Sequence, residues 1–157
     1  QLQRFDYVVL QEQSTLPIKN AARTLEHIRD FDAPIRETGA RTVLYMTWAR
    51  RNAPQTQDAL SMAYIEAGSA TGAIVVPAGL AWQRCLQDHP DILLHDKDQS
   101  HPNPAGSYLA ACTFYAALFL GRSRSIPAIA IDLQDHEIDA LHTAALETVR
   151  TYNKGQR

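Results

Sequence analysis

Three short apolar segments rich in β-branched residues constrain the fold of this chain more than any other feature. They cover residues 5–11, 41–47 and 73–77, and polar residues or turns bound each of them. Runs of this length without polar alternation are typical of strands buried on both faces of a parallel sheet. Helical segments follow them, so the sequence predicts strands and helices that alternate along the chain.

The helices expected from apolar spacing cover about residues 19–38, 55–68, 104–120 and 134–153, with a short helix from about Ala81 to Leu86. Pro34 is expected to kink or end the first helix. Alternating strands and helices join by right-handed crossovers into a doubly wound parallel sheet between two helical layers. We therefore expect a three-layer α/β/α fold in a single domain over residues 1–157, with a soft boundary at residues 121–127.

Composition excludes several classes of function. The chain has 157 residues, of which 45% are hydrophobic and 20% charged, and its formal net charge is −2. It lacks the basic excess that binding to nucleic acid or an anionic membrane requires. No apolar run approaches the roughly 20 residues of a membrane span, so a soluble protein is expected. Cys85 and Cys112 fall on apolar helices and are predicted to be free, buried thiols.

The segment from Asp98 to Tyr108 carries the strongest functional signal. Asp98 lies three residues before His101, on a loop that leads into the helix predicted from residue 104. A carboxylate in this position can accept the Nδ1 proton of His101 and leave Nε2 free to take a proton from a nucleophile. The pair is predicted to be catalytic; the alternative is a solvated loop with a surface histidine.

Polar side chains also follow the apolar runs, where ligands of open α/β sheets bind. The first run ends in four polar residues, Gln11, Glu12, Gln13 and Ser14. They are candidate site residues, unless they only begin the loop to the next helix. Trp48 and Trp82 follow the second and third runs, and are predicted either to wall a substrate pocket or to pack in the core.

Taken together, these segments resemble the SGNH (GDSL-type) esterase superfamily. In that family a strand ending in Gly-x-Asn-Asp supplies an oxyanion donor, and Gln11 and Gln13 stand at the Gly and Asn positions here. The late Asp-x-x-His motif of the family matches Asp98 and His101. Residues 75–82, VVPAGLAW, resemble a Pro-x-Gly-x-Ala-Trp segment found in one branch. The resemblance covers most of residues 5–120.

The resemblance implies a flavodoxin-like fold of strand order 2-1-3-4-5 and a serine esterase mechanism. Asp98 would orient His101, and Gln13 would donate a hydrogen bond to the oxyanion, since a Gln carboxamide offers the same kind of N–H as Asn. Gln11, Ser14, Trp48 and Trp82 would contact substrate. No serine of this sequence follows an apolar strand in the family's Gly-x-Ser turn.

We therefore expect the N-terminal strands and the nucleophile turn to precede Gln1. A signal peptide cleaved before Gln1 is the alternative, and would place the protein in the periplasm or outside the cell; the sequence leaves the location open. Without its neighbour, the strand at residues 5–11 would present a bare apolar edge. Residues 1–157 alone are expected to be inactive and to self-associate through that edge.

The predicted activity is the hydrolysis of an ester, such as an acetyl group on a carbohydrate or another small alcohol, without a metal or other cofactor. One alternative is a non-catalytic relative that binds carbohydrate. Another is a metal-dependent hydrolase whose ligands come from an Asp/His cluster at residues 88–101. That cluster comprises Asp88, His89, Asp91, His95, Asp96, Asp98 and His101.

Overall fold

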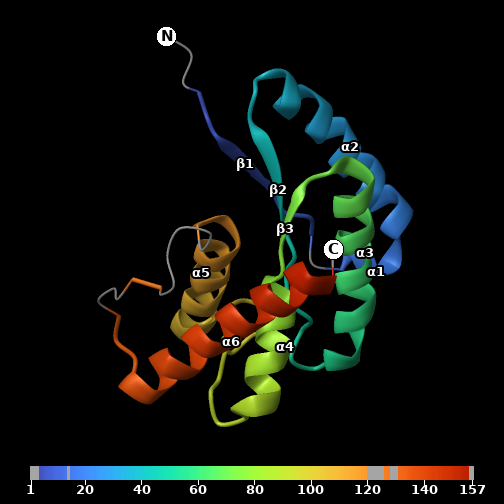
Figure 1. The fold of residues 1–157 in the computed structure, drawn as a ribbon. Coiled ribbons are helices and arrows are strands. Elements are labelled where there is room, and N and C mark those ends of the chain that lie inside the picture. Colours follow the sequence, from blue (N-terminus) through green and yellow to red (C-terminus); the bar gives the residue numbers. More distant parts are fainter. Residues whose placement is uncertain (1–3, 14, 120–125, 128–130, 156–157) are drawn as a thin grey trace.

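The computed structural model describes residues 4–13, 15–119, 126–127 and 131–155 (Figure 1). In chain order these residues form β1 (Tyr7–Leu10), α1 (Leu16–Lys19), α2 (Ala21–Glu37), β2 (Arg41–Tyr45), the 3-10 helix η1 (Pro54–Thr56), α3 (Gln57–Thr71), β3 (Ile74–Val76), α4 (Ala78–Asp88), α5 (Pro104–Phe119) and α6 (Asp135–Gly155). None of the helices in these described parts is long and apolar enough to cross a membrane.

The three strands form one parallel sheet in the order β1-β2-β3. Val43 of β2 pairs with Val9 of β1 on one side and with Ile74 of β3 on the other, and it is fully buried. β1 forms an edge of this sheet, and 47% of Val9 is exposed. The expected α/β class and the parallel pairing are confirmed, whereas self-association through β1 stays a prediction.

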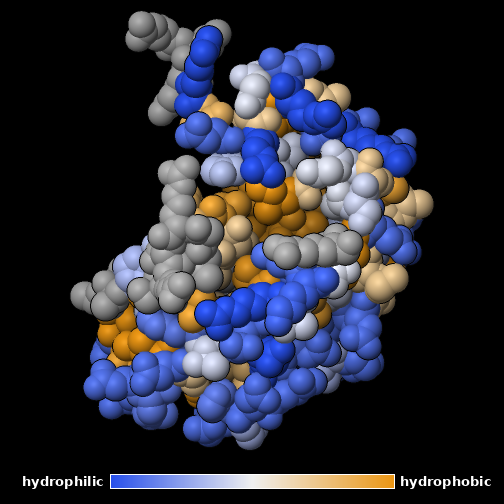
Figure 2. All heavy atoms as spheres, viewed as in Figure 1, coloured by the Kyte–Doolittle hydropathy of each residue, from blue (hydrophilic) through white to orange (hydrophobic). Residues whose placement is uncertain are grey.

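Helices lie on both sides of the sheet (Figure 1). On one side, α2 and α3 pack against β2 and β3, around a core that includes Leu44, Leu60 and Tyr64. On the other side, α5 contacts β3, and α6 packs on α4 and α5 around Trp82 and Leu109. Figure 2 shows hydrophobic atoms gathered over the strands, between hydrophilic surfaces of the flanking helices. This arrangement is the three-layer fold that the sequence predicted.

The structure corrects several details of that prediction. α2 continues past Pro34 to Glu37, because Pro34 lies on the exposed side of the helix, where water can bond the carbonyl group of Asp30 that loses its donor. The short helix α1 was not expected. The boundary expected at residues 121–127 falls mostly outside the described residues, and α6 beyond it packs on the body of the protein.

Both cysteines are confirmed as free, buried thiols on helices: Cys85 lies on α4 and Cys112 on α5. Burial raises the pKa of each thiol to about 11, so both stay protonated at neutral pH. Neither thiol is therefore suited to act as a nucleophile.

Gly106 sets how closely α5 approaches α4. A Cβ at this position would lie 2.3 Å from the carbonyl oxygen of Leu94 and 2.6 Å from Cζ2 of Trp82. We expect Gly106→Ala to lower the free energy of unfolding by about 1–3 kcal/mol, the usual cost of overpacking, as measured by urea denaturation. Gly155→Ala on α6 is the matched control, because no atom lies within 4 Å of its Cβ position. Equal losses in the two variants would contradict the close approach.

Candidate active site

The loop between α4 and α5 is folded back on itself by main-chain hydrogen bonds. His95 and Pro102 form an isolated antiparallel bridge, and the N–H of Asp96 donates to the carbonyl of His101 at 2.8 Å. At the tip, Gln99 adopts a left-handed conformation with φ of 63°. This closed loop holds Asp98 and His101 on one short turn.

Asp98 binds His101 through both of its carboxylate oxygens. Oδ1 accepts the main-chain N–H groups of Ser100 and His101, each at 2.9 Å, and Oδ2 accepts Nδ1 of His101. Because a carboxylate at neutral pH can only accept, Nδ1 carries the proton and a neutral His101 keeps Nε2 unprotonated. The expected Asp98–His101 hydrogen bond is therefore present in the geometry that a general base requires.

The charge of Asp98 is stabilised by the same contacts. The hydrogen bond from His101, followed by those from the two main-chain N–H groups, holds the pKa of Asp98 well below its ordinary value. Both side chains remain open to solvent, with 79% of His101 and 50% of Asp98 exposed. Nε2 of His101 is thus accessible to a partner from another segment.

Three hydrogen bonds attach this loop to the segment after β2. Trp48 donates Nε1–H to the carbonyl of Ser100 at 3.0 Å, and the N–H of Arg51 donates to the carbonyl of Gln99 at 2.9 Å. Nε2 of His95 lies 3.0 Å from the carbonyl oxygen of Ala49; since that oxygen only accepts, His95 must donate. The position of His101 is therefore set by the loop that follows the central strand.

A cavity of about 300 Å³ lies next to this junction. Its walls include Trp48, Trp82, Leu86, Arg51 and His95. The two indoles stack in parallel with ring centroids 3.9 Å apart. Only 1% of Trp82 is exposed, so it supports Trp48 from the core, and Trp48 is the half-buried partner. Trp82 thus packs in the core and Trp48 lines the cavity, whereas their contact with a substrate stays a prediction.

Gln57 is a wall residue of this cavity that sequence reasoning missed. It is buried at the first turn of α3, and its Oε1 accepts the N–H of Ala49 at 2.7 Å. Its Nε2 donates to Oγ of Ser61 at 3.0 Å. The sequence offered no signal for this role, because a glutamine at a helix start is ordinarily exposed.

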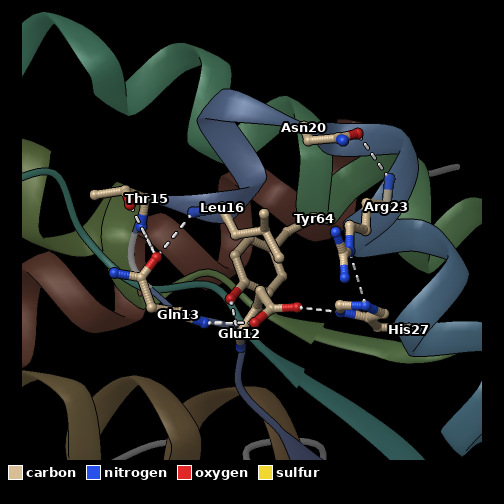
Figure 3. Close-up of polar contacts among 8 residues, drawn as sticks. All are labelled: Glu12, Gln13, Thr15, Leu16, Asn20, Arg23, His27 and Tyr64. Carbon is tan, nitrogen blue, oxygen red and sulfur yellow. Dashed lines mark hydrogen bonds and ion pairs between the residues drawn. The ribbon is translucent and has the colours of Figure 1, made fainter.

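At the end of β1, Gln13 is fixed by the start of α1 (Figure 3). Its Oε1 accepts hydrogen bonds from the N–H groups of Thr15 and Leu16 at 2.9 and 3.1 Å. It also accepts one from the hydroxyl group of Thr15 at 2.9 Å. Main-chain N–H groups only donate, so this end of the carboxamide must be the oxygen. Nε2 therefore points away from α1, with no hydrogen-bond partner among the described residues.

The other strand-end candidates are placed only in part. Gln11 is exposed, and Ser14 lies outside the described residues. Within the described parts of the chain, no hydrogen bond joins Gln13 to Asp98 or His101. The meeting of Gln13 and His101 in one cleft stays a prediction.

The Asp/His cluster does not form a metal-binding arrangement in the part of the chain that the structure describes. No three His, Cys, Asp or Glu side chains converge there. Asp98 is turned to His101, and His95 is turned to a carbonyl group. The geometry thus gives the metal-dependent alternative no support.

Comparison with known proteins relates the fold, not the sequence, to other chains. No family model matches the sequence, and no curated protein gives a significant match. A protein from Slackia heliotrinireducens described as "a putative SGNH hydrolase" has a similar structure, with 23% identity, a TM-score of 0.66, and coverage of 74% of this chain and 67% of that one. A DUF4886 family protein from Bacteroides uniformis ATCC 8492 has 21% identity, a TM-score of 0.75, and coverage of 95% and 64% respectively.

These likenesses show a shared fold. The chain spans about two thirds of the length of both proteins. The expected α/β architecture is thereby confirmed, and the likeness to the protein described as a putative SGNH hydrolase is one of fold.

The lowered pKa of Asp98 can be measured directly. We expect the pKa of Asp98 to rise toward its ordinary value in His101→Ala, because the largest cause of the shift is lost while the two main-chain hydrogen bonds remain. An NMR titration of the Asp98 carboxyl carbon provides the measurement. Because the folded pKa is lowered, the stability this carboxylate contributes is present above the ordinary carboxyl pKa and lost as the pH falls through the lowered one.

His89→Ala is the control for this titration, since His89 begins the same loop and, among the described residues, forms no hydrogen bond or ion pair with Asp98. The pKa of Asp98 in His89→Ala should equal the pKa of Asp98 in the unmodified protein. A shift of the same size in both variants would mean that the loop, not the imidazole, lowers the pKa.

Proposed function

We propose that this chain carries the acid–base half of a serine esterase of the SGNH type. The supporting observation is the Asp98–His101 pair, in which the carboxylate fixes the imidazole and leaves Nε2 exposed. The serine nucleophile would come from a segment outside residues 1–157, because the sequence lacks a strand-to-helix Gly-x-Ser turn. The similar fold of the Slackia protein agrees with this assignment.

The chemistry follows the usual steps of acyl transfer. Nε2 of His101 accepts the proton of the serine hydroxyl as its oxygen attacks the ester carbonyl, and Asp98 stabilises the resulting imidazolium. Nε2–H of Gln13 donates a hydrogen bond that stabilises the negative charge on the carbonyl oxygen. His101 then returns the proton to the leaving alcohol, and water releases the acyl group by the same route.

The proposed substrate is an acyl ester, such as an acetyl group, on a carbohydrate or another small alcohol. The cavity beside the His101 loop is at the small end of the range for ligand pockets, and Trp48 gives it an aromatic wall. Aromatic walls suit the apolar faces of sugar rings. Gln11 and Ser14 remain proposed substrate contacts at the end of β1.

Ester turnover by the natural full-length protein tests this proposal. We expect His101→Ala to lower kcat/KM by about 10³-fold or more, because a triad member acts as part of a unit. Gln13→Ala should cost on the order of 10²-fold, the usual loss for one oxyanion donor. His89→Ala serves as the control and should leave turnover unchanged. Activity that a chelator abolishes and zinc or manganese restores would overturn the serine mechanism.

A non-catalytic carbohydrate-binding protein is the second candidate. The cavity with its stacked tryptophans supports binding whether or not a nucleophile reaches His101. Calorimetric binding of a sugar that is lost in Trp48→Ala, together with no ester turnover and no labelling by a fluorophosphonate, would favour this candidate. Labelling that depends on His101 would favour the esterase.

A further inference from the structure

A second carboxylate–imidazole pair lies directly beside Gln13, and the esterase assignment gives it no role. Glu12 follows β1 and faces α2 and α3 (Figure 3). Its Oε2 lies 2.9 Å from Nδ1 of His27 on α2, and its main-chain N–H donates to Oη of Tyr64 on α3 at 3.2 Å. Its Oε1 accepts the main-chain N–H of Gln13 at 2.8 Å. Glu12 thus joins Gln13 to two helices.

The hydrogen bond between Arg23 and His27 determines which nitrogen of His27 carries the proton. Arg23 donates Nε–H to Nε2 of His27 at 3.4 Å, and a guanidinium group has no acceptor. Nε2 of His27 must therefore be unprotonated, and Nδ1 carries the proton that it donates to Glu12. One carboxylate oxygen of Glu12 accepts a hydrogen bond from His27 on α2, and the other accepts one from the main chain of Gln13. Glu12 thus links α2 to the loop after β1.

Glu12 remains ionised in this environment although its side chain is only 19% exposed. Burial acts to raise the pKa of Glu12, but the hydrogen bonds from His27 and from the N–H of Gln13 outweigh it and lower the pKa. The charged form, which accepts both bonds, is thus the form present at neutral pH.

The helices around this network are also held by apolar packing. α2, α3 and the sheet already share an apolar core that includes Ile28, Leu44 and Leu60. What the polar contacts add is the geometry of residues 12 and 13, in a segment where Gln13 itself is exposed. An exposed segment would otherwise sample several conformations.

We propose that Glu12 is a positioning residue for Gln13, anchored by His27 on α2 and by Tyr64 on α3. The inference rests on the proposed function, in which Nε2–H of Gln13 stabilises the oxyanion. Glu12 holds the main chain of Gln13, while Thr15 and Leu16 hold its side-chain oxygen. Two independent contacts therefore aim the amide N–H₂ before substrate binds, which is how a preorganised donor lowers the barrier.

The same contacts decide which group of Gln13 donates. Its main-chain N–H is already bonded to Glu12, so it is not free to meet an oxyanion. Only the side-chain amide remains, which distinguishes this site from one built on main-chain donors. A change at Glu12 should therefore alter turnover and leave substrate affinity intact.

Steady-state kinetics of the full-length protein tests this split. We expect Glu12→Ala to lower kcat about 10-fold with KM unchanged, because the misplaced donor acts in the transition state. Glu12→Gln keeps a carbonyl oxygen for the N–H of Gln13 but turns its N–H₂ toward the Nδ1–H of His27, so it should recover only part of the lost kcat. Glu26→Ala, which removes an exposed carboxylate from α2, is the control and should match the unmodified protein.

Should Glu12→Ala fail to fold, Tyr64→Phe replaces it, since it removes only the hydroxyl that accepts the N–H of Glu12. A smaller fall in kcat, again without a change in KM, is then expected. An unchanged kcat in Glu12→Ala, alongside a lost activity in His101→Ala, would overturn the positioning role and leave the esterase assignment standing.

Hydrogen exchange provides a readout that does not depend on catalysis. The main-chain N–H of Gln13 should exchange slowly in the unmodified protein and in Glu26→Ala, and several-fold faster in Glu12→Ala. If no ester is turned over but this exchange pattern holds, the contact is real and the esterase assignment is wrong. If exchange is the same in all three proteins, Glu12 does not position Gln13.

Discussion

The parallel pairing of the three strands is the constraint on which the candidate site depends. Because β1, β2 and β3 run in the same direction, the segments that follow them all emerge at one end of the sheet. The N–H of Gly79 after β3 donates to the carbonyl of Met46 after β2 at 3.0 Å, so these segments are joined there. An antiparallel neighbour would have sent one of them to the opposite end.

Two carboxylate–imidazole pairs with the same chemistry receive different roles from their surroundings. Asp98 and His101 belong to one turn, and most of the imidazole is exposed, so its free nitrogen can act on another group. Glu12 and His27 bridge two elements, and the second nitrogen of His27 is taken by Arg23. The availability of Nε2, more than the presence of a carboxylate, separates a candidate catalytic pair from a positioning one.

Much of the fold followed from the sequence because its signals are local. The strands and the five longer helices were expected from apolar spacing, and the structure places each within a few residues. Local rules failed where they did not account for the surroundings. Of the two outcomes expected at Pro34, a kink or an end, the helix end did not occur, because Pro34 lies on the exposed side of α2, where water can replace the lost hydrogen bond. Likewise, Trp82 could not be assigned to core or pocket without knowing that Trp48 covers it.

The sequence by itself predicted the Asp98–His101 pair, since residues three apart on a tight turn can meet through local geometry. Only the tertiary structure revealed how Glu12 and Ser100 are held. Glu12 bonds Tyr64, and Trp48 bonds Ser100, each across 52 positions of the chain. Such contacts depend on how helices pack on the sheet, and no motif records them. Contacts between residues close in sequence can be predicted from their spacing, whereas the long-range contacts that support a site depend on tertiary packing.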